Sequence, residues 1–167
     1  MASAYPRKTS EIRNAVLAIG AAGLIAGTLD LGETLVVFGA KSPLVIAAGL
    51  LGSQNALRGG AAVYALGVLL HYLIVVSAAA IYFAASRRLH FLIESWLICG
   101  LLFGMAIDVV MRFIVLPLSA MHSMGPYKYH DLVLGLVVHM VLVGLPIAFC
   151  VRRFSRVTEL VGQSVRG

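Results

Sequence analysis

The residues of this chain that could do chemistry are ionisable side chains in the interiors of long apolar segments. There are six of them, in the order Asp30, Glu33, His71, Asp108, Arg112 and His139. A charge at the centre of a bilayer costs about 2.5 kcal/mol or more on insertion scales, so such side chains face other helices and pair with one another. Carboxylate and imidazole groups held in a low dielectric bind protons or divalent cations. These side chains are therefore the candidates for function.

Two aspartates lie one helical turn before a second charge. Asp30 precedes Glu33 by three residues and Asp108 precedes Arg112 by four, so each pair shares one helix face. Counting about 1.5 Å per residue from the segment centres places the aspartates at similar depths, and Glu33 and Arg112 at similar depths. The spacing predicts a Glu33–Arg112 ion pair that braces or gates a site built around the aspartates.

Each histidine of this set follows a glycine by four residues. Gly67 precedes His71 in GVLLH, and Gly135 precedes His139 in GLVVH. A glycine one turn from an imidazole leaves space beside the ring, either for a closely packed helix or for a flat ligand. Depth counting places both rings within about 3 Å of the mid-plane. The pattern predicts two histidines at one level on different helices.

The elements that must position these residues are membrane helices. Hydrophobic residues make up 60% of the 167 residues, charged residues only 12%, and the mean hydropathy is +0.97. Soluble domains carry about 25% charged residues, so this composition excludes a soluble enzyme, a disordered tail and a conventional nucleic-acid binder.

Four apolar segments reach the length of about 20 residues that a membrane-crossing helix needs. They cover approximately residues 12–40, 60–86, 89–118 and 131–151. Backbone groups in lipid must be paired within the segment itself. The sequence therefore predicts one all-α domain over residues 1–167, a four-transmembrane-helix bundle.

Basic residues gather on one side of this bundle. They precede the first segment, separate the second from the third, and follow the fourth: Arg7, Lys8, Arg13, Arg87, Arg88, Arg152, Arg153 and Arg156. The positive-inside rule then places both termini in the cytoplasm. The net charge of +6 is a signal of topology and of contact with anionic lipid, and it does not indicate a nucleic-acid partner.

The segments form two helical hairpins with one plan. In each hairpin an aspartate with a charge one turn further on is followed, in the next segment, by Gly-x-x-x-His. The first and third segments both run outward, so a pseudo-two-fold axis along the membrane normal would relate the hairpins. Such an axis would bring Asp30 beside Asp108, and His71 beside His139.

One interpretation of the cluster is a cation site. Asp30, His71, Asp108 and His139 could surround one divalent metal ion or share a proton, because carboxylates and imidazoles are suitable ligands for both. The same groups could serve a proton-coupled transporter. With only four helices such a protein would enclose a pathway as a homo-oligomer.

Two other interpretations use the same residues. His71 and His139 could ligate a b-type haem, with Gly67 and Gly135 giving the porphyrin room, in a haem-bearing or accessory subunit of a larger membrane complex. Alternatively, the cluster could be purely structural and set the register of the helices.

An enzymatic role has little support in the motifs. The chain contains no nucleophile elbow, CxxC pair, HExxH or phosphate-binding loop. Asp30 and Asp108 could share a proton as in an intramembrane hydrolase, but their surroundings match no such protease pattern. We therefore predict a membrane protein that binds or transports a proton or a divalent cation, with the lipid bilayer as its surroundings.

Five stretches of sequence are similar to those of a known group. They are GTLD (Gly27–Asp30), AAGLLG (Ala47–Gly52), LHY (Leu70–Tyr72), FIVLPLSA (Phe113–Ala120) and VHMVLVGLPIA (Val138–Ala148). With them the chain resembles, from about residue 20 to residue 153, a family of uncharacterised bacterial inner-membrane proteins with four transmembrane helices. The resemblance implies a bacterial inner-membrane location and the same four-helix plan, and it implies no activity.

Overall fold

The computed structural model describes the backbone of residues 5–164 except 124 and 127, and the side chains of residues 12–155 apart from the same two. All regular structure in this part of the chain is helical, with no strand. Four helical segments are long and apolar enough to cross a membrane: Ile12–Phe38, Ala61–Ser86, Trp96–Leu118 and Tyr129–Ser155. The predicted all-α fold with four membrane-crossing helices is confirmed.

The first hairpin consists of α1 (Tyr5–Phe38) and α4 (Ala61–Ser86). The inward face of α1 is built from alanines four residues apart, Ala18, Ala22 and Ala26, which are fully buried. Small side chains let helix backbones approach closely, and four-residue spacing keeps them on one face. This row of alanines allows α1 to pack against helices of both hairpins.

A short helical cap connects these two helices. It consists of α2 (Ser42–Leu51) and α3 (Ser53–Ala56), which are separated by Gly52 at a φ of 76°. Glycine suits this position because other residues rarely adopt a positive φ. α2 packs against α4 so closely that a Cβ at Gly67 would collide with the backbone carbonyl of Pro43. The cap therefore fills the space that Gly67 leaves.

The second hairpin contains a π-helical segment in each of its long spans. In chain order its elements are α5 (Phe91–Glu94), α6 (Trp96–Val110), η1 (Met111–Val115), α7 (Leu116–Leu118), α8 (Tyr129–Val138), η2 (His139–Gly144) and α9 (Leu145–Ser164). A Cβ at Gly104 would collide with the carbonyl of His139, and a Cβ at Gly144 with the carbonyl of Gly100. These glycines bring the third and fourth spans into backbone contact.

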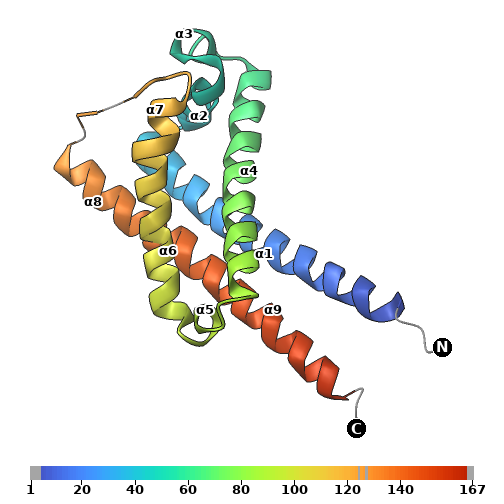
Figure 1. Ribbon diagram of the computed structural model, residues 1–167. Helices are drawn as coiled ribbons and strands as arrows, with labels where there is room; N and C mark the ends of the chain where they lie inside the picture. The colour runs from blue at the N-terminus through green and yellow to red at the C-terminus, as the bar shows by residue number, and fades with distance from the viewer. Residues whose placement is uncertain (1–4, 124, 127, 165–167) are drawn as a thin grey trace.

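The two hairpins cross through α1 and α9, which pack against each other in the middle of the bundle (Figure 1). The turn that contains α5 lies toward the end of the bundle where α1 begins and α9 ends. The cap and the connection between α7 and α8 lie at the opposite end, where the amide of Ala120 donates to the carbonyl of Gly49 at 2.8 Å. The bundle therefore has one end with both termini and one capped end.

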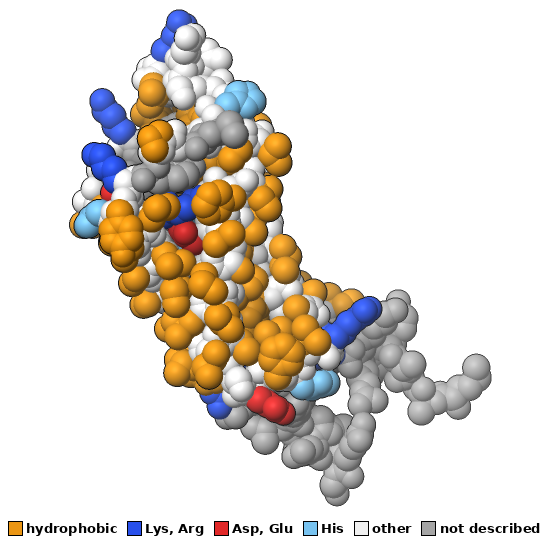
Figure 2. Space-filling model, turned by 60° about the vertical axis from the view of Figure 1, so that its left-hand side comes forward, with side chains coloured by type: hydrophobic (Ala, Val, Ile, Leu, Met, Phe, Trp, Pro, Cys, Tyr) orange, Lys and Arg blue, Asp and Glu red, His pale blue; other side chains and the backbone are white. Residues whose placement is uncertain are grey.

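Large hydrophobic side chains cover the sides of this bundle (Figure 2). Val36 and Leu118, for example, expose 85% and 79% of their surface. Exposed apolar area on this scale is unfavourable in water and is what acyl chains contact in a bilayer. Together with the four apolar helices, this surface is that of a membrane protein.

Candidate functional site

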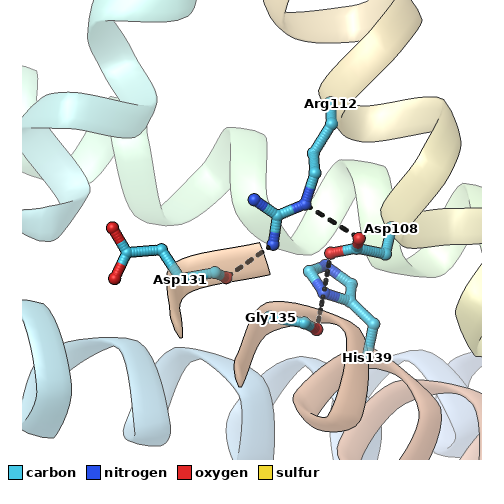
Figure 3. A network of polar contacts seen from close by, with 5 residues as sticks. All are labelled: Asp108, Arg112, Asp131, Gly135 and His139. Atoms are coloured by element: carbon cyan, nitrogen blue, oxygen red, sulfur yellow. Dashed lines mark hydrogen bonds and ion pairs between the residues drawn. The ribbon is translucent and has the colours of Figure 1, made fainter. Parts of the chain in front are cut away.

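Asp108 and Arg112 form a buried ion pair in the half of the third span that lies nearer the capped end (Figure 3). Nε of Arg112 donates to Oδ2 of Asp108 at 2.8 Å, and their side chains are only 13% and 7% exposed. Nη2 of Arg112 donates to the backbone carbonyl of Asp131 at 3.0 Å. The guanidinium therefore joins the third span to the start of the fourth.

His139 is the third member of this cluster. Its Nδ1 lies 2.8 Å from the carbonyl of Gly135, one turn earlier on its own helix, and 3.2 Å from Oδ1 of Asp108. That carboxyl oxygen is buried and has no hydrogen bond of good geometry among the described residues. Both neighbours of Nδ1 are acceptors, so Nδ1 carries a hydrogen. The imidazole N–H thus lies between a carbonyl and a carboxylate.

Gly135 makes the room in which these groups meet. A Cβ at this position would collide with Nη2 of Arg112 and would lie 3.2 Å from Oδ1 of Asp108. The sequence predicted that Gly135 leaves space beside the His139 ring. The structure fills that space with the guanidinium of Arg112, a side chain of the protein itself.

A second acid–histidine pair, Asp30 and His71, lies in the first hairpin. Nε2 of His71 lies 2.9 Å from the carbonyl of Gly27 and 3.9 Å from Oδ2 of Asp30. His71 and Asp30 are buried, with 7% and 8% of their surface exposed. Here too the neighbours are acceptors, so Nε2 carries the hydrogen. The two hairpins therefore hold similar pairs, built on opposite ring nitrogens.

The predicted metal ligands are distributed over these two pairs. Asp30 contacts His71, and Asp108 contacts His139. Within the described residues, no group of three or more His, Cys, Asp or Glu side chains is placed to hold one metal ion. The structure therefore brings the acids to the histidines within each hairpin, and does not gather them around one point between the hairpins.

The residues predicted to make room for a haem have neighbours of their own. Gly67 faces Pro43 and Gly135 faces Arg112, so neither glycine leaves open space beside its histidine. Each histidine also has a ring nitrogen on a backbone carbonyl. Atoms of the protein itself therefore occupy the positions beside Gly67 and Gly135 that were predicted to make room for a porphyrin.

Glu33 lies apart from the ion pair that was predicted for it. Among the described residues, Arg112 contacts the carboxylate of Asp108 and the backbone carbonyl of Asp131. Oε1 of Glu33 is buried without a hydrogen-bond partner in the same part of the chain.

Sequence reasoning missed the π-helical segments, which contain the site. Arg112 lies in η1, and His139 begins η2. π-helical turns are rare and occur frequently at functional sites. Pro117 and Pro146 each lie two residues after the end of one of these segments. A proline in a membrane helix frees the carbonyl four residues earlier, and a local π adjustment can pair it again. These prolines were the signal available in the sequence.

The two histidines are expected to hold opposite tautomers. In ¹⁵N NMR spectra of protein labelled at histidine, the His139 signal should show a hydrogen on Nδ1 and the His71 signal a hydrogen on Nε2, because these nitrogens face only acceptors. Assignment through His71→Gln and His139→Gln would identify each signal. The same tautomer at both positions would contradict the geometry.

The remaining ring nitrogens, Nδ1 of His71 and Nε2 of His139, have no hydrogen-bond partner among the described residues. Each is therefore free to accept a proton.

No protein-family model matches the chain, and no curated protein or solved structure is significantly similar to it.

Proposed function

We propose that the chain is a membrane protein that binds a proton at Asp108 and His139, beside Arg112, and passes it across the bilayer. One observation carries this proposal: Nδ1–H of His139 lies between the Gly135 carbonyl and Oδ1 of Asp108. A carboxylate that faces an imidazole N–H in a low dielectric can exchange a proton with it over a single short distance. Asp108, His139 and Gly135 thus form a proton-binding unit.

Arg112 supports this function through its charge. The guanidinium stays protonated in proteins, and its Nε lies 2.8 Å from Oδ2 of Asp108, so a permanent positive charge lies beside the carboxyl group. Buried ionisable residues are rare in membrane helices because their desolvation is costly. Those that do occur commonly belong to proton relays or ion pathways.

The setting of this site is part of the proposal. The basic residues favour cytoplasmic termini, and the resemblance in sequence favours a bacterial inner membrane. The Asp–His pair in each hairpin favours the pseudo-two-fold relation between them. With four membrane-crossing helices, we expect a homo-oligomer or a larger membrane complex to enclose the pathway.

Proton flux into liposomes tests this function. Purified protein is reconstituted with a pH-sensitive dye inside, and a potassium diffusion potential drives protons. We expect Asp108→Asn to lower the flux about a hundredfold, since a positioned proton-transfer group commonly contributes at least that factor. If liposomes that contain the wild-type protein take up protons no faster than empty liposomes, the proposal is wrong.

Asp131→Asn is the matched control for this experiment. Its carboxylate points away from Arg112 (Figure 3), and only the backbone carbonyl, which asparagine keeps, receives the guanidinium. Flux should remain at the wild-type level. Metal analysis and an absorption spectrum of the same preparation separate the alternatives. A stoichiometric divalent metal ion that is lost in Asp108→Asn would show that the site binds a metal ion instead of a proton. A Soret band would show that the protein binds haem.

A further inference from the structure

A cation–π contact joins the third and fourth spans at the end of the bundle that holds both termini. The guanidinium carbon of Arg152, on α9, lies 5.4 Å from the ring centre of Trp96, the first residue of α6. The same ring meets that of Phe149 edge to face, with the ring centres 5.6 Å apart. Both separations are in the range of favourable ring contacts. The cation of Arg152 is therefore held by an aromatic pair.

The packing around this contact fixes its position. The hydroxyl of Tyr82, on α4, donates to the backbone carbonyl of Leu92, in α5, at 2.9 Å. Leu92 and Trp96 pack against a buried core that contains both Tyr82 and Val151. Arg152 directly follows Val151 on α9, so its guanidinium stands at the edge of this core.

The polar groups of this contact are all hydrogen-bond donors. Arginine and tryptophan side chains carry N–H groups and no acceptor, and a cation–π contact uses the face of the ring instead of an N–H group. In the described part of the chain, neither the guanidinium of Arg152 nor Nε1–H of Trp96 donates a hydrogen bond, and no carboxylate pairs with Arg152. These donors are available to an acceptor from outside the chain, and an anionic oxygen suits a guanidinium best.

More positive charge gathers around the contact. Arg87 and Arg88 lie between α4 and α5, Arg153 follows Arg152 on α9, and all three are exposed. α4, α5 and α9 pack against one another at this end of the bundle (Figure 1). Glu94 of α5 adds one carboxylate, so positive charge is in excess among the side chains described here.

Apolar side chains adjoin the same contact on the side of the bundle. Phe149, one turn before Arg152 on α9, is 52% exposed, and Leu97, next to Trp96, is 50% exposed. Such side chains contact acyl chains in a bilayer, and tryptophan is enriched at the level of the headgroups. A ligand that satisfies both parts of this surface has acyl chains and an anionic head.

We propose that Arg152 and Trp96 form a binding site for the headgroup of an anionic phospholipid. The lipid phosphate accepts hydrogen bonds from the guanidinium and from the indole N–H, while its acyl chains contact Phe149 and Leu97. The neighbouring arginines favour a headgroup with a net negative charge over a zwitterionic one. The site lies at the opposite end of the third span from the half that holds Asp108, so it does not depend on the proton-binding function proposed above.

Trp96 provides the readout, because it is the single tryptophan of the chain. The protein is reconstituted in phosphatidylcholine bilayers with a fixed fraction of either phosphatidylglycerol or phosphatidylcholine that is brominated near the headgroup, since bromine quenches tryptophan fluorescence on contact. We expect brominated phosphatidylglycerol to quench more strongly. The ratio of the two quenching strengths compares lipids within one protein, so differences in the brightness of Trp96 cancel. Equal quenching by both lipids would overturn the proposal.

Substitutions of Arg152 test the site itself. Arg152→Gln should lower the preference for phosphatidylglycerol about fivefold, the effect of one basic residue near an anionic membrane surface. Arg152→Lys keeps the charge without the planar set of donors and should recover part of that loss, and it carries the test if Arg152→Gln does not fold.

Arg58→Gln is the matched control. Arg58 is an exposed arginine beside the cap, at the other end of the bundle, so its substitution removes the same charge and should leave the preference unchanged. An equal loss in Arg58→Gln and Arg152→Gln would show a general attraction between a basic protein and an anionic bilayer. That result, or an unchanged preference in Arg152→Gln, would overturn the site.

Inorganic phosphate distinguishes a lipid from a soluble anion. Added at the ionic strength of a chloride control, it should leave the quenching by brominated phosphatidylglycerol unchanged, because it has no acyl chains to contact Phe149 and Leu97. If phosphate relieves the quenching more than chloride does, the site binds a free anion and the assignment to a lipid is wrong.

Discussion

Replacing Arg112 by methionine is expected to lower the free energy of unfolding by about 3 kcal/mol, because it leaves the Asp108 carboxylate buried without its ion partner. The Asp108 side chain is only 7% exposed, so water cannot replace the lost guanidinium. The loss is measured in detergent micelles by titration with a denaturing detergent, followed by circular dichroism. Arg88→Met, at an exposed position between α4 and α5, should change the stability little.

A double-mutant cycle separates the pair from the individual residues. When Asp108→Asn is combined with Arg112→Met, no charge is left unpaired at this position. The double variant should therefore be more stable than the sum of the single losses indicates, by about 1–3 kcal/mol. Strict additivity of the two substitutions would show that the ion pair does not contribute as the structure indicates.

Replacing Gly104 by alanine is the second substitution with a large expected effect. The new Cβ would collide with the backbone carbonyl of His139, which cannot move aside as a flexible side chain can. Forcing extra volume into such a contact costs about 1–3 kcal/mol. The third and fourth spans would also separate at the histidine, so proton flux should fall together with stability.

Gly20→Ala is the matched control for this substitution. Gly20 is also in a membrane-crossing helix, but a Cβ there has nothing within 4 Å. Alanine restricts the unfolded chain more than glycine does and should raise the free energy of unfolding by about 0.5–1 kcal/mol. Effects of the same sign at Gly104 and Gly20 would contradict the backbone contact.

The spans were predictable because long apolar runs have few alternatives in a bilayer. The second segment, expected at about residues 60–86, is Ala61–Ser86 in the structure. The third was expected from residue 89 but begins at Trp96. A short helix ends before it at Ser95, whose φ of −97° and ψ of 39° are not helical. Hydropathy does not register such a break, because the residues on both sides are apolar.

The partners of the charged residues were harder to predict. Depth along a span suggested Glu33 for Arg112, whereas Asp108, one turn away on the same helix, is the residue that Arg112 contacts. The choice of partner depends on how each helix is rotated about its axis. Successive side chains along a helix point about 100° apart, so a small rotation changes which of them face a neighbouring helix. Spacing along the chain therefore shows which residues share a face, and packing decides which face meets which. The glycine contacts, such as that of Gly67 with Pro43, belong to this second kind of information.

The π-helical segments have a mechanical consequence for the second hairpin. A π segment is a single wider turn with i→i+5 hydrogen bonds, and it holds one residue more than the α-helical turn that it replaces. One extra residue corresponds to about 100° around the helix axis, so side chains beyond the segment point in directions different from those in an uninterrupted helix. Arg112 and His139 both lie in such segments. The third and fourth spans therefore present the side chains beyond these segments to different neighbours than uninterrupted α-helices of the same sequence would.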